Sequence, residues 1–264
     1  MAPDLARDGA VIDEESTGAR MLDAYEKIRM AILDGVFRPG SRLSQVKISA
    51  ELGLSRTPVR EALRLIEKEG LVTSERGRQV VISPTSMADL DELYALRIKL
   101  DTTTVRSTVP DLTDADIEEM RNCLAVMGEN EAPAQFSDFD RAHRSFHMIA
   151  IRAAGPRHAD YSAQLNEHAE RYRRLYLTHA SSYQQSRDEH QAIMDACAAR
   201  DGDLVACLLA EHYARIALTI IAQIEPVFEP RLVRAAVRLA LQDRSGPSRK
   251  DQFERRVAGG EPRS

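Results

Sequence analysis

The sequence contains few of the residues on which disulfide-stapled scaffolds and zinc-knuckle proteins depend. Three cysteines, Cys123, Cys197 and Cys207, occur among 264 residues, and their scattered spacing matches neither a disulfide framework nor a zinc knuckle. No run reaches the roughly 20 apolar residues of a membrane span, and no apolar signal segment stands at the start. We therefore expect a cytoplasmic protein without a membrane partner, in which the cysteines are small buried hydrophobes.

The sequence also lacks catalytic motifs, and it shows no strand pattern after residue 84. There is no H-E-x-x-H motif, and no serine or cysteine nucleophile stands beside a histidine in a recognisable elbow. The chain is long enough for two domains, and its C-terminal part shows helical periodicity throughout. We therefore expect a mainly α protein that is not an enzyme.

The most informative segment runs from Gly53 to Gly70. Arg56, Thr57 and Arg60 crowd its first two turns, where backbone amide donors and a partial positive charge gather at the start of a helix. Such a helix start can contact phosphates and base edges in the major groove of DNA. By itself the segment fits a surface helix with solvated arginines as well. Apolar residues recur in it at helical spacing, namely Leu54, Val59, Leu63 and Ile66.

The flanking segments complete a winged helix-turn-helix. Helical patterns over residues 24–33 and 45–52 precede the segment, and a tight turn at Gly53 leads into it. Downstream, two β-branched runs flank residues 75–78 and predict a hairpin. The tip of this hairpin is basic and is formed by Arg76, Gly77 and Arg78.

This region, and above all its stretch SRTPVREAL, resembles the winged-helix domain of the GntR superfamily of bacterial transcription regulators. The resemblance implies that Arg56, Thr57 and Arg60 read bases, and that the glycine of the hairpin tip lets the backbone approach the minor groove. Many relatives carry a DNA-contacting arginine on the preceding helix, where Val46 stands here. Lys47 can substitute as a phosphate contact, but the operator preference at that base does not follow from the resemblance.

Charge is divided unevenly along the chain. Residues 20–85 hold 12 Lys and Arg against 8 Asp and Glu, whereas the remainder holds 24 against 33. This asymmetry favours a DNA-facing domain at 20–85 and an acidic helical domain at 86–242. Gly-, Ser- and charge-rich composition predicts disordered tails at 1–19 and 243–264.

Between the wing and the C-terminal tail, the sequence predicts an antiparallel all-helical bundle of about 140 residues. Thr113 and Asp116 form a capping-box pattern at one helix start. A turn at residues 201–203 joins two long helices into an antiparallel pair. The predicted helices run from 86 to Pro110, and over 113–127, 134–154, 161–176, 186–200, 204–224 and 230–241.

Four histidines of this bundle are candidates for a metal site. His143 and His147 lie four residues apart on one helix face, the spacing that two imidazoles need to share one ion. His190 lies 12 residues before Gly202 and His212 lies 10 residues after it, so both come to a similar height in an antiparallel pair. Chance remains an equal explanation for the first pair alone, because the chain has seven histidines.

The bundle resembles the FCD domain of the FadR branch of the same superfamily. The resemblance rests on ELYALRIKLD, FH…RAAG and DEHQAIMDACAARDGDLVACLLAEH, in that order, over roughly residues 88–224. It implies a divalent metal bound by His147, His190 and His212. The usual fourth ligand is an aspartate, but His143 stands at that position and Asp140 lies nearly one turn away. Such a set of imidazoles favours Zn²⁺ or Ni²⁺ over Mg²⁺ or Ca²⁺.

The resemblance also implies a small carboxylate effector that is held by the metal and by an arginine. Arg97 matches the family's Leu-Arg pair and is our candidate for that arginine. A surface ion pair between Arg97 and Asp101 is the alternative. Other candidates are Arg171, Arg173 and Arg174.

Together these features predict a homodimeric transcription regulator, most often a repressor in this branch, that binds an inverted repeat in double-stranded DNA. A metal-dependent hydrolase with an appended nucleic-acid-binding domain is the alternative, and it would need an open coordination position and a general base. A DNA-architectural protein without a ligand is the third possibility, and it leaves the histidines unexplained.

Overall fold

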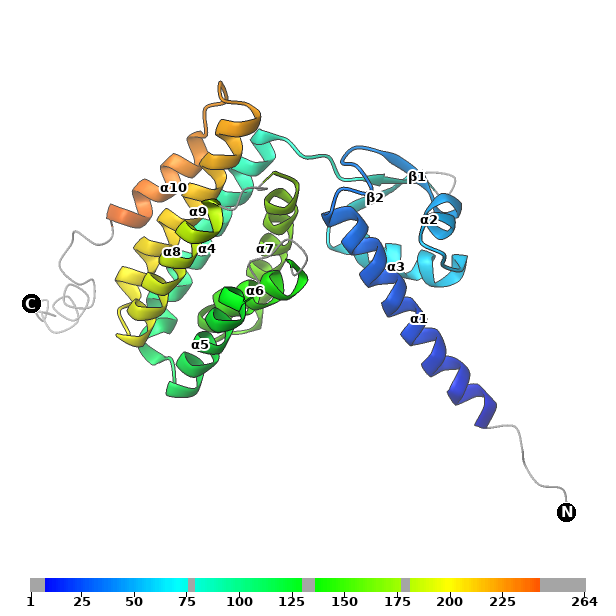
Figure 1. The fold of residues 1–264 in the computed structure, drawn as a ribbon, viewed down its shortest axis with the longest axis horizontal. Coiled ribbons are helices and arrows are strands. Elements are labelled where there is room, and N and C mark those ends of the chain that lie inside the picture. The colour runs from blue at the N-terminus through cyan, green and yellow to red at the C-terminus, as the bar shows by residue number, and fades with distance from the viewer. Residues whose placement is uncertain (1–7, 76–78, 130–135, 177–180, 243–264) are drawn as a thin grey trace, which may run out of the picture. The chain divides into compact units, whose positions relative to one another are not determined.

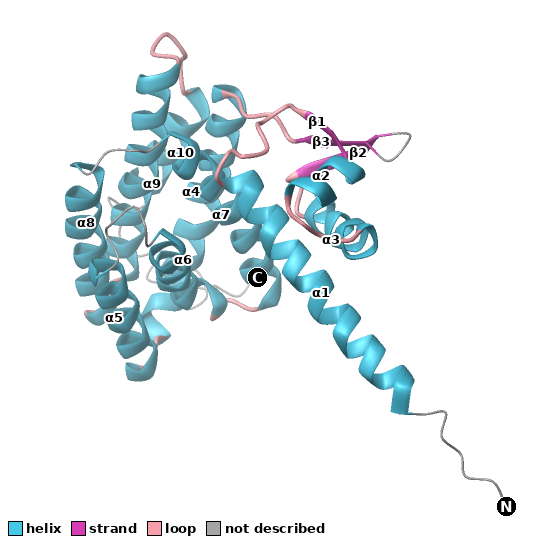
Figure 2. Ribbon diagram, turned by 45° about the vertical axis from the view of Figure 1, so that its right-hand side comes forward, coloured by secondary structure: helices cyan, strands magenta, loops and turns pink. Residues whose placement is uncertain are grey.

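The computed structural model describes residues 8–75, 79–129, 136–176 and 181–242 (Figure 1). The chain divides into two compact units. One comprises residues 1–89 together with 167–178, and the other comprises 90–166 and 179–264. Helices predominate and a small sheet accompanies them (Figure 2), so the predicted mainly α fold class is confirmed.

The first unit is a three-helix arrangement with a small antiparallel sheet. The strands pair in the order β1-β3-β2, and Leu43 and Ser74 both lie opposite Val80. This is the winged helix-turn-helix that the sequence predicts. Its elements are α1 (Asp8–Leu33), β1 (Arg42–Ser44), α2 (Gln45–Glu51), α3 (Arg56–Lys68), β2 (Val72–Glu75) and β3 (Gln79–Ile82).

Helix α3 is oriented by its apolar side. Gly53 and Gly70 bracket it with φ angles of +65° and +76°, a left-handed conformation that favours glycine. Ser55 occupies the N-cap position with an extended backbone, but its side chain makes no capping hydrogen bond. The residues of α3 that are buried in the core are Val59, Ala62, Leu63 and Ile66.

Three features of this unit differ from the prediction or escape it. Helix α1 begins at Asp8, so residues 8–19 are helical although the sequence suggests a disordered tail. Alanine and glutamate in this segment are good helix formers, so α1 can extend N-terminally beyond its packed part. Strand β1 has three residues, too few for a periodicity to reveal it. The predicted wing-tip residues Arg76, Gly77 and Arg78 lie outside the described residues.

The second unit contains the helical bundle. Helix α9 carries buried residues on most of its surface and forms the centre of the core. The capping box of α5 is confirmed, because Asp116 N–H donates to Thr113 Oγ1 and Thr113 N–H donates to Asp116 Oδ2. The helices are α4 (Met87–Thr108), η1 (Val109–Asp111), α5 (Asp114–Glu129), α6 (Phe136–Arg152), α7 (Pro156–Tyr176), α8 (Ser181–Ala198), α9 (Gly202–Ile224) and α10 (Arg231–Gln242).

The limits of the bundle differ from the sequence-based domains within α7. Residues 167–178, which include the second half of α7, cluster with the first unit rather than with the bundle. Position along the chain cannot reveal such a division, because it depends on which neighbours a helix packs against. Residues 243–264, the predicted C-terminal tail, lie outside the described residues.

Helix α9 is the one helix, in the part of the chain that is described, whose length and composition would allow it to cross a membrane. Its apolar window is 67% buried within the protein. The sequence was expected to contain no membrane-span candidate. Helix α9 corrects this expectation, because it is long and apolar enough to be one. A buried core helix of a globular bundle has the same composition.

The start of α9 gives a prediction about stability. A Cβ atom on Gly202 would lie 2.9 Å from the backbone oxygen of Arg106 and 3.1 Å from that of Val105. Because backbone atoms of α4 cannot move aside, we expect Gly202→Ala to lower the free energy of unfolding by about 1–3 kcal/mol. The shift of the urea unfolding midpoint measures this.

The matched control is Gly128→Ala on α5, where an added Cβ would meet nothing within 4 Å. That change should raise stability by about 0.5–1 kcal/mol, because alanine is the better helix former. If both variants were stabilised to the same extent, the close approach of α9 to α4 would not hold in solution.

Candidate metal centre and DNA-binding surface

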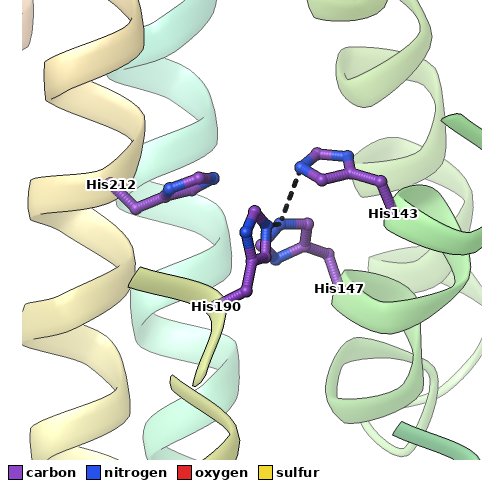
Figure 3. A group of neighbouring side chains, drawn as sticks. All are labelled: His143, His147, His190 and His212. Atoms are coloured by element: carbon purple, nitrogen blue, oxygen red, sulfur yellow. Dashed lines mark hydrogen bonds between the residues drawn. The ribbon is translucent and has the colours of Figure 1, made fainter. Parts of the chain in front are cut away.

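Four histidine side chains from three helices converge inside the second unit (Figure 3). Helix α6 supplies His143 and His147, α8 supplies His190, and α9 supplies His212. Each is at most 6% exposed, and one ring nitrogen of each lies within 4.8 Å of the others. The structure therefore brings together all four histidines that the sequence predicts as ligands.

The spacing of these nitrogens fits a single transition-metal ion. The Nε2 atom of His147 lies 3.3 Å from Nε2 of His143 and 3.1 Å from Nε2 of His190. Four nitrogens placed tetrahedrally at Zn–N bond lengths of about 2.0–2.1 Å are separated by roughly 3.3 Å from one another. Two of the six nitrogen–nitrogen separations thus match such a site, and all four nitrogens lie within 4.8 Å of one another.

The hydrogen bonds on the outer side of two rings direct lone pairs inward. His190 Nδ1 lies 2.5 Å from the backbone oxygen of Ser186, and His212 Nδ1 lies 2.7 Å from Glu189 Oε2. Both oxygens accept, so Nδ1 carries the proton in each ring and Nε2 of the neutral imidazole offers a lone pair. Lone pairs that converge in a buried site need a proton or a cation between them. The donor set therefore fits a metal ion.

Asp140 and Phe139 lie on α6 near the same cluster. Asp140 is 4% exposed, but it is not one of the residues whose ligand atoms converge. The ring of Phe139 stacks on His143 with a centroid distance of 5.8 Å. The converging ligands are four nitrogens, with His143 at the position where the resemblance expects an aspartate.

Arg97 on α4 is fully buried next to the cluster's neighbour Tyr213. Its guanidinium lies 4.0 Å from the ring centroid of Tyr213 and donates from Nη2 to Asn166 Oδ1 at 2.9 Å. The ring of Tyr213 lies 5.8 Å from that of His147. Arg97 thus places a buried guanidinium one aromatic ring away from the histidines, beside the carboxylate of Asp101.

Asp101 is the buried carboxylate of the same polar network. Its Oδ1 accepts from Ser162 at 2.7 Å and its Oδ2 accepts from Tyr213 at 3.0 Å. Burial raises the pKa of Asp101, and the nearby charge of Arg97 opposes that rise. The alternative of an exposed Arg97–Asp101 surface pair is therefore wrong, because both side chains lie in the core.

The other candidate arginines belong to the first unit. Arg171 donates to the backbone oxygen of Ser83, and Arg174 forms ion pairs with Asp34 and Glu170. Arg97 is thus the one of the four predicted candidates that lies in the same unit as the histidines. Arg173 also falls in the segment 167–178.

A cavity of about 10 Å³ borders the histidine cluster at His190. This volume is close to that of a single water molecule. A small molecule that enters here must displace side chains of α5, α6 or α8. The cavity is lined by Leu124, Met127, Gly128, Phe139, Ser186, Arg187 and His190.

The predicted DNA-reading residues are exposed on the first unit. Arg56, Thr57 and Arg60 occupy the first two turns of α3, on the side away from its buried residues. Arg60 Nε contacts Glu61 Oε1 at 3.2 Å in an exposed ion pair, which water weakens. No acidic residue stands in the first turn of α3. This surface suits contact with a polyanion.

Val46 and Lys47 lie on α2, the helix that precedes the turn. Val46 is 51% exposed, and Lys47 forms a surface ion pair with Glu51 at 3.6 Å. Lys47 is therefore placed where it could contact a phosphate, whereas Val46 offers no hydrogen bond to a base.

Sequence reasoning missed several partners of the site. Glu189 was visible directly before His190, but its contact with His212 was not predicted. Asn166 and Tyr213, which contact Arg97, gave no signal in the sequence. Their side chains are brought to Arg97 by the packing of α7 and α9 against α4.

Two family models match this chain. The model described as "Bacterial regulatory proteins, gntR family" matches residues 21–82, and the model described as "FCD domain" matches residues 92–215. The two matches correspond closely to the winged helix-turn-helix and to the helices that carry the histidines.

Curated bacterial regulators are similar over part or most of the chain. The gluconate operon transcriptional repressor of Bacillus subtilis is 32% identical over 142 residues, which cover 54% of this chain and 57% of the repressor. The HTH-type transcriptional repressor RspR of Escherichia coli is 24% identical over 197 residues, which cover 74% of this chain and 86% of RspR. The uncharacterized regulator YdhC of B. subtilis is 29% identical, and the alignment spans 62% of its length.

Solved structures share the fold. A putative transcriptional regulator GntR from Rhodococcus sp. RHA1 aligns with a TM-score of 0.63 at 25% identity, over 80% of this chain and all of that one. McbR/YncC of E. coli aligns with a TM-score of 0.63 at 21% identity, over 74% of this chain and 94% of McbR/YncC.

Proposed function

This chain belongs to the GntR family of bacterial regulatory proteins and carries an FCD domain, and we propose that it is a metal-containing, effector-responsive repressor. It is a transcriptional regulator, and its winged helix-turn-helix is the DNA-binding part. Two relatives named as repressors favour repression over activation. We place its action in the cytoplasm, where its operator DNA lies.

The proposed DNA target is a short inverted repeat in double-stranded DNA. A homodimer places two copies of α3 on two half-sites, because the symmetry of the protein is mirrored in its operator. Arg56, Thr57 and Arg60 would read base edges, and the wing tip of Arg76, Gly77 and Arg78 would contact the adjacent minor groove. The exposure of the first two turns of α3 supports this assignment.

The proposed sensing function rests on one observation. The buried side chains of four histidines lie close enough together to share one ion, namely His143, His147, His190 and His212. Four imidazole nitrogens without a carboxylate suit a borderline ion, and we propose Zn²⁺, with Ni²⁺ as the second candidate. When bound, such an ion supplies a positive charge and joins α6, α8 and α9. The histidines hold it through Nε2, with the outer nitrogens of His190 and His212 fixed by their acceptors.

We propose that the effector is a small carboxylate that is attracted by the metal and paired by Arg97. Because the cavity beside His190 is only about 10 Å³, an effector that enters there has to displace side chains of α5, α6 or α8. Such a displacement can alter the DNA-bound state, and linkage requires DNA to weaken effector binding by the same factor.

The contacts of Glu189 do not favour the hydrolase alternative. A metal-dependent hydrolase needs a carboxylate beside a metal-bound water. Glu189 is instead held by His212 and Arg215 on the outer side of the cluster. No observation favours this alternative over the regulator.

A gel-shift titration tests the proposal with a DNA fragment from the protein's own promoter region. The zinc-loaded full chain is mixed with the fragment in the presence of a panel of mono- and dicarboxylates. We expect a narrow set of acids to weaken DNA binding by about 5- to 150-fold, the usual range of allosteric coupling. If no acid altered DNA binding or the melting temperature, the effector proposal would fail.

Arg97→Gln is the variant that examines the arginine. It should bind the fragment like the wild type without effector and lose the response to the acids. Because Arg97 is buried, its substitution can affect folding, so the melting temperature of the variant is measured in parallel. A variant that folds and still responds fully would exclude Arg97 as the pairing group.

A further inference from the structure

We propose that Glu189 and Arg215 are a positioning pair that sets how tightly the four-histidine cluster holds its metal. The proposal rests on the metal site proposed above and adds two residues that do not touch the ion. Glu189 lies on α8 directly before His190, and Arg215 lies on α9 three residues after His212. All of these residues belong to the second unit.

Glu189 joins one metal ligand to a fixed cation. Its Oε2 accepts from His212 Nδ1 at 2.7 Å and from Arg215 Nη2 at 2.7 Å. Its Oε1 accepts from Arg215 Nε. The two-pronged contact of the guanidinium fixes the plane of the carboxylate, and the carboxylate in turn fixes the imidazole.

This contact decides what His212 can offer to the cluster. A carboxylate that accepts from Nδ1–H holds the neutral ring in the tautomer whose Nε2 carries the lone pair. It also increases the electron density on the ring and hence its strength as a ligand. Without Glu189, the Nδ1–H group of His212, a residue that is 1% exposed, would lose its acceptor.

The two outer contacts of the cluster differ in kind. His190 is held by the backbone oxygen of Ser186 on its own helix, which no side-chain substitution removes. His212 is held by a side chain from the neighbouring helix, so this contact also makes α8 and α9 keep a common register. The chain of contacts runs outward from the core, where His212 is buried, to Glu189 and Arg215, whose side chains are 25% and 19% exposed.

A purely structural cross-brace between α8 and α9 would give the same contacts. The two roles differ in their consequences for the metal. A brace contributes to the stability of the metal-free protein and leaves the ligand strength of His212 unchanged. A positioning pair changes metal affinity and the electronic spectrum of a bound ion, and it does so even where the metal-free protein remains folded.

The test is a competition titration of full-length protein, made without a polyhistidine tag, against a zinc-chelating dye. We expect Glu189→Gln to weaken zinc binding by about 10- to 100-fold, the usual effect of removing such an outer partner. Arg215→Lys keeps the charge but not the two-pronged geometry, so we expect a smaller loss. The d–d absorption of bound Co²⁺ should shift in Glu189→Gln, because the ligand-field strength of His212 changes.

The matched control is Asp188→Asn, which removes the same charge from the neighbouring exposed position of α8. It should leave the zinc affinity and the cobalt spectrum unchanged. An equal loss in both variants would indicate general electrostatics and overturn the proposal. So would a zinc affinity of Glu189→Gln within twofold of that of the wild type.

The failure of this proposal differs from that of the metal site itself. If the wild type bound neither zinc nor cobalt, the metal site and the positioning pair would both be refuted. If the wild type bound zinc and only Glu189→Gln were without effect, the four-histidine site would stand and Glu189 would be a brace.

Discussion

His147→Ala is expected to abolish stoichiometric zinc binding and with it most of the stability that the ion confers. His147 would be the central ligand of the proposed site, because its Nε2 lies 3.3 Å from that of His143 and 3.1 Å from that of His190. A ligand that binds only the folded state at 1,000 times its Kd adds about 4.1 kcal/mol of stability. For a unit of this size, that corresponds to a rise in melting temperature of roughly 10 °C, at 2–4 °C per kcal/mol.

Elemental analysis and thermal melts with and without zinc measure the two effects. Zinc should raise the melting temperature of the wild type and leave that of His147→Ala unchanged. His158→Ala is the control, because His158 lies in the same unit but contacts Thr104 at 2.9 Å and not the cluster. A His147→Ala protein that retained one zinc per chain would show that the ion binds elsewhere.

The helices could be predicted from the sequence because their signals are local. The pattern of Thr113 and Asp116 marks the start of α5, and both reciprocal hydrogen bonds are present. Gly70, directly after the C-cap of α3, has the left-handed conformation that commonly ends a helix. Strand β1 escaped prediction because a three-residue strand is defined by its partner β3, here through the pairing of Leu43 with Val80, and not by its own pattern.

Half of the metal cluster could be predicted from the spacing of His143 and His147 on one helix. The other half followed from counting residues on either side of the Gly202 turn, and the structure confirms that His190 and His212 reach the same place. The family resemblance alone would have expected an aspartate at position 143. The imidazole there is what makes the donor set entirely nitrogen.

The remaining contacts of the site could not be predicted, because they depend on side-chain directions across helices. Glu189 was visible beside His190, but its bond to His212 depends on how α8 and α9 pack. Arg97 was predicted from a two-residue resemblance, and its stacking on Tyr213 depends on the packing of α4 against α9. The division of α7 between the two units likewise follows from tertiary contacts alone.

The double variant Arg56→Ala, Arg60→Ala is expected to bind a promoter fragment at least about 30-fold more weakly than the wild type does. Each good contact between an arginine and a base edge contributes about 1–3 kcal/mol, so two together amount to about 2–6 kcal/mol. Both side chains are exposed and lie outside the core formed by Val59, Leu63 and Ile66. The fold should therefore be unchanged, and circular dichroism checks this.

Gel shifts at several salt concentrations separate the two kinds of DNA contact. If the arginines read bases, the double variant should lose specific binding and approach the affinity for unrelated DNA; if they contact phosphates alone, binding should weaken equally on all sequences and the salt dependence should decrease. Arg121→Ala on α5 is the control, because Arg121 has a similar exposed ion pair, with Glu118, but lies in the other unit. A double variant that bound the fragment as tightly as the wild type would refute α3 as the recognition helix, whatever the histidines bind.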